Sequence, residues 1–253
     1  MNTKELLNKI LFYISVPKCI SCGEILDKCD APLCEECYRK YEEIKESECS
    51  ECFNKIGRCT CSNPFMQKHF IKQACKVYRY RRNSNNDIGN KLIYSLKQDN
   101  RRDVIEFLAG EVTNSIVGNG IPALLKNDYI ITSVPRRKNA IRNFGYDHAE
   151  LLARAVAKNF GVTYSALLVS KTKKAQKEVT SDERFANAKV DYKNNINCDI
   201  NGKHVIIVDD IVTTGSSMSA CASLIRGLGA KSITAACVAI AYMDEYTPFK
   251  AKD

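Results

Sequence analysis

Two acidic residues stand directly after a run of branched apolar residues in the C-terminal third of the chain. Residues 205–208 read Val-Ile-Ile-Val, and Asp209 and Asp210 follow at once. A short run that is apolar at every position is typical of a strand buried on both faces of a parallel sheet. Adjacent carboxylates at the end of such a strand can hold sugar hydroxyls or a hydrated divalent metal ion.

A loop of small, mostly hydroxyl-bearing residues follows these acids. It consists of Thr213, Thr214, Gly215, Ser216 and Ser217, and helical spacing begins at Ser216. Backbone N–H groups and hydroxyls at a helix N-terminus form a ready site for an anion. The simpler alternative is a buried strand with a polar helix cap. The acid pair disfavours it, because adjacent buried carboxylates need partners.

Nine of the 13 cysteines lie in the first 61 residues, and eight of these form three Cys-x-x-Cys pairs and one Cys-x-Cys pair. The paired residues are Cys19, Cys22, Cys34, Cys37, Cys49, Cys52, Cys59 and Cys61. Two such pairs make one tetrahedral four-thiolate zinc site, so the eight residues predict two sites. We expect the first four to bind one zinc ion and the last four another, although interleaved pairing is open.

Other interpretations of the cysteines are a disulfide framework or a single zinc site with four unligated thiols. A reducing cytosol disfavours disulfides, and nothing marks the chain as secreted. Cys29 and His69 are alternative ligands, although each is more simply a loop residue. The short polar segments between the pairs cannot build a core alone, so metal would have to fold them.

Length and charge divide the 253 residues into two expected domains. Residues 1–65 carry 9 basic and 11 acidic side chains, whereas residues 66–253 carry 29 and 18, a net charge of +11. We therefore expect a helix and double zinc ribbon over 1–65 and a basic α/β domain over 66–253. No run of 18 apolar residues predicts a membrane span, and residues 3–14 read as an amphipathic helix rather than a signal peptide. A cytoplasmic location is expected.

Strand and helix patterns alternate along the second domain, as a parallel sheet flanked by helices requires. Strands are predicted over 74–80, at a sheet edge, and over 129–134, 166–169, 205–209 and 232–240. Helices are predicted over 88–96, 104–117, 147–160 and 216–228.

The thirteen residues 205–217 resemble the 5-phosphoribosyl-1-pyrophosphate (PRPP) motif of type I phosphoribosyltransferases. The resemblance implies that Asp209 and Asp210 bind the ribose hydroxyls and that the loop 213–217 wraps the 5′-phosphate, with Mg²⁺ bound alongside PRPP. Arg136, Arg137 and Lys138 follow the predicted strand 129–134, where this family carries its pyrophosphate loop.

The order of motifs along almost the whole chain looks like that of the competence-associated ComF family, in which a zinc ribbon precedes a phosphoribosyltransferase domain. The segments 142–153 and 171–187 carry this resemblance together with the cysteine pairs. Within the second segment, Lys171, Gln176 and Arg184 are candidates for a lid that excludes water during transfer. An exposed charged loop is the alternative.

Three functional hypotheses follow. The resemblance implies a protein of DNA uptake in natural transformation that binds PRPP and, weakly, single-stranded DNA, with a DNA-uptake protein as a further partner. The second hypothesis is an active phosphoribosyltransferase of nucleotide metabolism. The third is a PRPP-sensing regulator that contacts its partner through the zinc ribbon. No catalytic residue is identified, because Thr213 stands where purine-salvage relatives carry an aspartate base.

Overall fold

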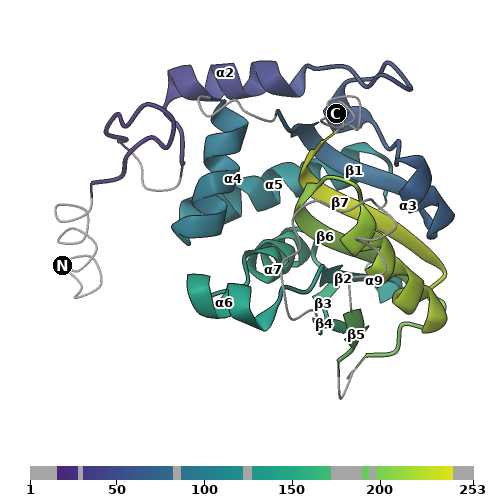
Figure 1. Cartoon of the computed structure of the whole chain (residues 1–253). Helices are drawn as coiled ribbons and strands as arrows, with labels where there is room; N and C mark the ends of the chain where they lie inside the picture. The colour runs from purple at the N-terminus through teal and green to yellow at the C-terminus, as the bar shows by residue number, and fades with distance from the viewer. Residues whose placement is uncertain are drawn as a thin grey trace, which may run out of the picture.

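Five parallel strands form the central sheet of the protein (Figure 1). The computed structural model describes residues 16–27, 31–81, 87–121, 127–171, 190–193 and 198–241. Across the sheet the strands are β1 (Ile71–Arg79), β7 (Ser232–Ile240), β6 (His204–Val212), β2 (Tyr129–Ser133) and β3 (Thr163–Tyr164). Neighbouring strands all run parallel, so their carboxyl ends lie at the same edge, where open α/β sheets bind ligands. The predicted fold class is confirmed.

Helices cover both faces of this sheet. One face carries α4 (Ile88–Gln98), α5 (Arg102–Gly118) and α7 (His148–Phe160), and the other carries α9 (Ser216–Gly227). β6 serves both layers because its side chains alternate between the two faces. Ile206 and Val208 belong to the core beneath α5 and α7, whereas Val205 and Ile207 belong to the core beneath α9.

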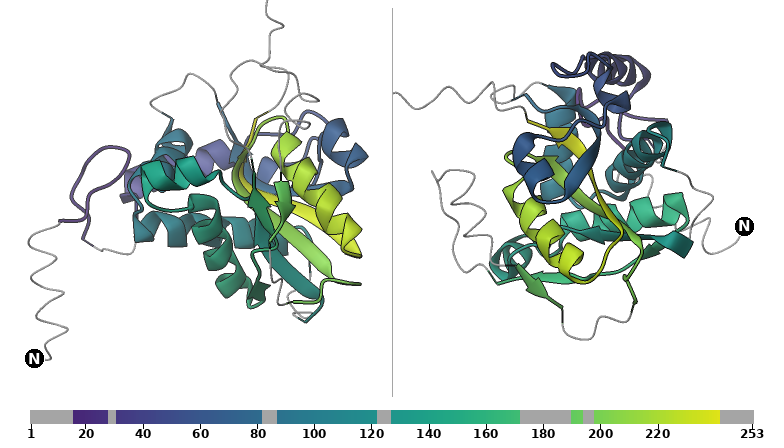
Figure 2. Two further views of the ribbon diagram at one scale, coloured as in Figure 1. Left: turned by 60° about the horizontal axis from the view of Figure 1, so that its bottom comes forward. Right: turned by 90° about the vertical axis from the view of Figure 1, so that its right-hand side faces the viewer.

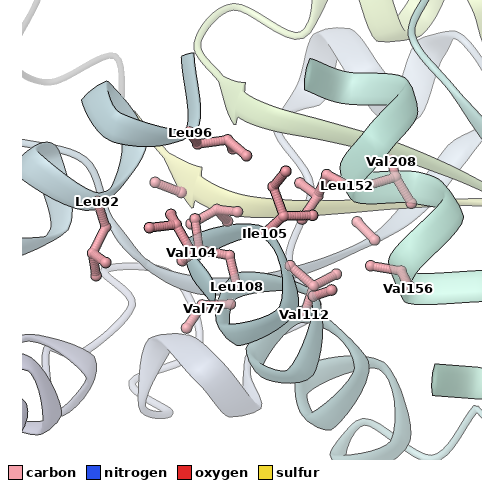
Figure 3. Packing of buried hydrophobic residues seen from close by; sticks show 14 of the residues in the cluster. Val77, Leu92, Leu96, Val104, Ile105, Leu108, Val112, Leu152, Val156 and Val208 are labelled. Atoms are coloured by element: carbon pink, nitrogen blue, oxygen red, sulfur yellow. The ribbon is translucent and has the colours of Figure 1, made fainter. Parts of the chain in front are cut away.

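The core between α5 and α7 fixes the position of the central strand (Figure 3). Leu108 and Val112 of α5 lie near Leu152 and Val156 of α7, and Val208 of β6 belongs to the same cluster. All five side chains are fully buried. Burial of each contributes roughly 1.5–3 kcal/mol. The end of β6 is therefore held rigidly against α7.

The helix boundaries follow the local capping signals. Asp87 and Asp147 are the N-caps of α4 and α7, and each side chain accepts a hydrogen bond from the backbone N–H three residues later. Gly161 ends α7 with a φ of 75°, a conformation that glycine adopts without strain. The four predicted helices of the second domain are confirmed within a few residues.

Two strand predictions need correction. β6 does not end at Asp209, as predicted, but continues to Val212, since Ile211 and Val212 still pair with β7. The strand expected over 166–169 is β4 (Leu168–Ser170), which pairs antiparallel with β5 (Val190–Tyr192) in a separate small sheet. Thr163 and Tyr164 occupy the edge of β2 instead, because the turn at Gly161 returns the chain to the sheet directly after α7.

The N-terminal part packs on the sheet domain and has only a small buried cluster of its own, formed by Cys49, Ile56 and Cys59. It contains α2 (Glu35–Lys45), the 3₁₀ turn η1 (Ile56–Arg58) and α3 (Pro64–Lys68). Figure 2 shows this part from two further directions. Tyr41 of α2 is fully buried in the same cluster as α4 and α5, and its hydroxyl donates to Glu111 at 3.2 Å. The sequence patterns did not predict α2, because the segment is mostly polar and only two of its residues, Cys37 and Tyr41, are buried.

None of the helices in the described ranges is both long and apolar enough to span a membrane. The predicted helix over 3–14 lies outside the described residues. The division of the chain at residue 65 remains a prediction.

Candidate functional site: an acidic strand end and two cysteine clusters

Asp210 is the centre of a buried ionic network at the carboxyl end of β6. Its side chain is 5% exposed. Its Oδ2 lies 2.9 Å from Lys97 Nζ, 3.0 Å from His148 Nε2 and 3.4 Å from Arg136 Nη2. These partners come from α4, from the first residue of α7 and from the segment after β2. Three elements on one side of the sheet thus converge on one carboxylate.

This network sets the charges of its members. Burial alone would raise the pKa of Asp210, but Lys97 and Arg136 outweigh it and hold that pKa well below the ordinary value. Burial lowers the pKa of His148 to about 4, with further lowering from Arg136 and Lys97 against the opposing effect of Asp210. At neutral pH the site therefore contains an ionised Asp210, two cations and a neutral imidazole.

Asp209 differs from its neighbour although the two are adjacent. It is half-buried, and its Oδ1 accepts a hydrogen bond from the Asp210 backbone N–H at 2.9 Å. Burial, and then the negative charge of Asp210, raise the pKa of Asp209 well above its ordinary value. A cation bound at this carboxylate would lower the pKa of Asp209 again, since an opposite charge favours the ionised form.

The loop after β6 has the geometry of an anion-binding helix start. Gly215 is the N-cap of α9 with a φ of 76°, and Ser217 is exposed beyond it. Thr214 and Ser216 are buried, and their hydroxyls lie 2.8 Å apart. The predicted loop therefore leads directly into α9. The backbone N–H groups of the first helical turn lie at this end, where an anion can bind.

The three basic residues predicted for the pyrophosphate loop separate in the structure. Arg136 points to Asp210, and its backbone N–H also donates to Asp147 at 3.3 Å. Arg137 is the N-cap of α6 (Lys138–Phe144), and Lys138 is exposed in the first turn of that helix. Arg136 alone among the three contacts the acid pair.

Lys97 and His148 are members of the site that the sequence did not indicate. Lys97 lies in the last turn of α4, where a basic residue is ordinary, and His148 follows the N-cap Asp147. Of the predicted lid residues, Lys171 forms an ion pair with Asp191 at the edge of the small sheet. Gln176 and Arg184 lie outside the described residues.

The eight paired cysteines gather into two groups of four, in sequential rather than interleaved order. The groups are Cys19, Cys22, Cys34 and Cys37, and Cys49, Cys52, Cys59 and Cys61. Within each group all sulfur atoms lie within 4.8 Å of one another. In the first, Cys22 and Cys34 are 3.7 Å apart at sulfur, close to the edge of about 3.8 Å in a tetrahedron with Zn–S bonds of about 2.3 Å.

A buried positive charge, that of Lys76, lies beside the second cysteine group and bears on whether this group fits a metal thiolate centre. This lysine of β1 is fully buried, and its Nζ donates to the carbonyls of Cys61 at 2.7 Å and Ala74 at 3.3 Å. The ammonium also interacts with the thiol of Cys59. Four thiolates with one Zn²⁺ carry a net charge of about −2, which would offset the buried cation. The donor set and its surroundings therefore fit zinc.

The alternative ligands do not join these groups in the described part of the chain. The ring of His69 lies tilted against that of Phe65, with the centroids 4.8 Å apart, and its Nδ1 lies 3.5 Å from the Ser223 hydroxyl. Cys29 lies outside the described residues.

Comparison with known proteins agrees with this geometry. The family model of the phosphoribosyl transferase domain matches residues 147–252, which include α7, β6, the acid pair and the loop. Residues 147–252 are thus similar to phosphoribosyltransferase domains. The DNA utilization protein YhgH of Escherichia coli K12 is 24% identical over 152 residues, 58% of this chain and 65% of YhgH. With the cysteine groups, these matches confirm the predicted resemblance to the ComF family.

Two further matches are more limited. Ribose-phosphate pyrophosphokinase 2 of Archaeoglobus fulgidus is 52% identical over 40 residues, 16% of this chain and 15% of that enzyme. A purine phosphoribosyltransferase from Pyrococcus horikoshii covers 54% of this chain and 72% of its own, with 20% identity and a TM-score of 0.36. The chain thus spans less than two thirds of the length of both curated relatives, YhgH and the ribose-phosphate pyrophosphokinase.

Proposed function

We propose that the carboxyl edge of β6 binds PRPP. The observation that carries the proposal is the ionised Asp210, held by Lys97 and Arg136, beside a helix start capped by Gly215. Carboxylates accept hydrogen bonds from ribose hydroxyls, and N–H groups at a helix start accommodate a phosphate. Both are present within one strand and the loop that follows it.

Each part of the site has a distinct role in this proposal. Asp209 and Asp210 hold the two ribose hydroxyls, the loop 213–217 surrounds the 5′-phosphate, and Arg136 neutralises the pyrophosphate. Mg²⁺ arriving with PRPP would supply positive charge beside Asp209, whose pKa is raised by burial and by the negative charge of Asp210. His148 is neutral and buried against Oδ2 of Asp210, so it keeps water and additional charge away from that oxygen.

Zinc at the two cysteine groups would have a structural role, because all four ligand positions of each group are protein thiolates and no position is left for substrate. The first group is tied to α4, since Lys91 donates to the Ser21 carbonyl at 2.7 Å. Zinc here would stabilise the part of the chain that packs on Lys97 and its helix.

We further propose weak, sequence-independent binding to single-stranded DNA, in the service of DNA uptake in natural transformation. The support is the net charge of +11 after residue 65 and the similarity to a DNA utilization protein. Arg79 and Arg81 lie at the end of the edge strand β1 and Arg81 is exposed, whereas Arg136 belongs to the acid network.

Calorimetric titration with PRPP and Mg²⁺, then with an oligonucleotide, and in the reverse order, tests both parts. We expect Mg²⁺-dependent PRPP binding that is lost in the variant Asp209→Asn. Replacing Arg79 and Arg81 together should weaken DNA binding but leave PRPP binding unchanged, whereas replacing Arg136 should damage PRPP binding. Absence of PRPP binding in the zinc-loaded protein would refute the proposal. Release of pyrophosphate with a nucleobase would instead favour an active transferase.

A further inference from the structure

The loop 213–217, which we call the phosphate loop, packs against α3, the short helix that directly follows the paired cysteines. The side chain of Met66, on α3, is fully buried. A Cβ atom placed on Gly215 would lie 2.4 Å from Met66 Cγ and 2.7 Å from its Sδ. The backbone of the loop therefore rests directly on this methionine, and a side chain at position 215 would displace it.

Asn63 joins α3 to the loop with a single side chain. Its Oδ1 accepts a hydrogen bond from the Met66 backbone N–H at 2.8 Å, which caps α3. Its Nδ2 donates to the carbonyl of Thr214 at 3.2 Å, across 151 residues of sequence. Both ends of one planar amide are thus used, so the position of Thr214 depends on the position of Asn63.

Asn63 is in turn positioned by the second cysteine group, because Cys61 lies only two residues before it. The carbonyl of Cys61 accepts from Lys76, and the neighbouring Thr60 carbonyl accepts from the Ala74 backbone N–H at 2.9 Å. The Ser62 hydroxyl donates to the Ile71 carbonyl at 2.8 Å. A short chain of fixed contacts therefore connects the thiols with the loop.

We propose that Asn63 and Met66 are positioning residues for the phosphate loop, and that metal binding at the second cysteine group orders the loop through them. The proposal builds on PRPP as the ligand of that loop. A metal ion fixes Cys61, Cys61 fixes Asn63, and Asn63 holds the Thr214 carbonyl so that the N–H groups of the loop remain preorganised for phosphate. Loss of this metal should raise the Kd for PRPP although no ligand contact is removed.

The decisive variant is Asn63→Ser. Serine remains a good N-cap for α3, but its side chain is too short to reach the Thr214 carbonyl. We expect unchanged zinc content and an increase in the Kd for PRPP of about three- to tenfold, the usual effect of losing one hydrogen bond. Amide hydrogen exchange over residues 213–217 should become faster. Lys68→Ala is the matched control, because this residue lies on the same helix and its side chain is exposed.

The two cysteine groups provide a second comparison. In Cys61→Ser, exchange should increase over 213–217, whereas in Cys22→Ser it should increase in α4, which Lys91 ties to the first group. Wild-type exchange over 213–217 in both Asn63→Ser and Cys61→Ser would overturn the proposal. If the wild-type protein does not bind PRPP, the proposed ligand is wrong, and the exchange comparison alone still decides whether the loop is held in this way.

Discussion

The adjacent residues Asp209 and Asp210 should respond in opposite directions when each is neutralised. Asp210→Asn removes the negative charge from a buried network of Lys97, Arg136 and His148. Asp209→Asn instead removes a carboxylate whose ionised form is unfavourable in the folded protein. Asparagine is nearly isosteric with aspartate, so the comparison changes charge and hardly any volume.

The size of the Asp210 effect follows from the exposure of its partners. Removing one member of a buried ion pair costs about 3–5 kcal/mol when the remaining charge cannot reach water. The side chains of Lys97 and Arg136 are 32% and 26% exposed, so both can turn partly to solvent. We therefore expect Asp210→Asn to lower the free energy of unfolding by about 2 kcal/mol.

Asp209→Asn should leave the free energy of unfolding unchanged or raise it. The raised pKa of Asp209 shows that its ionised form is less favourable in the folded protein than in the unfolded chain, so neutralising it removes a cost at neutral pH. The amide oxygen of asparagine can still accept the hydrogen bond from the Asp210 backbone N–H.

Urea denaturation at neutral pH, followed by circular dichroism on zinc-loaded protein, measures both effects. PRPP titration on the same samples separates ligand binding from folding, and both variants should bind PRPP poorly. Equal unfolding free energies for the two variants would refute the assignment of Asp210 as the buried, cation-paired acid, as would greater destabilisation by Asp209→Asn.

Four further outcomes are expected. Because the pKa of His148 is about 4 in the folded protein and about 6.5 in the unfolded chain, the folded state binds fewer protons between these values. The free energy of unfolding should therefore fall by up to about 3 kcal/mol between about pH 6.5 and about pH 4, and urea titrations should show a smaller fall in His148→Gln. Elemental analysis should find about two zinc ions per chain. Lys76→Met should release the zinc of the second group more readily to a chelator, whereas Lys72→Met, at an exposed position near the start of the same strand, should match the wild type. Binding to single-stranded DNA should weaken roughly tenfold or more between low and physiological salt, as measured by fluorescence anisotropy; salt-independent binding would exclude phosphate contacts as its source.

Local sequence patterns predicted the central strands and the helices of the sheet domain well. The apolar run before Asp209 predicted a buried strand, and the helix predicted over 147–160 agrees with α7 within one residue. The patterns failed where the partner decides the structure. Of the strand predicted over 166–169, only Leu168 and Val169 lie in a strand, and they pair with β5 rather than with the main sheet, because Thr163 and Tyr164 already occupy the edge of β2.

The sequence alone determined the chemistry that this protein can offer. Cysteine spacing predicted two thiolate groups, and the acid pair followed by Thr-Thr-Gly-Ser-Ser predicted a site for a phosphorylated sugar. Only the tertiary structure decided which acid is buried among cations and which residues support the loop. Arg136 meets Asp210 across 74 residues, and Asn63 meets Thr214 across 151. No periodicity reports such pairs, because they form only when the folded sheet and its helices bring distant segments of the chain together.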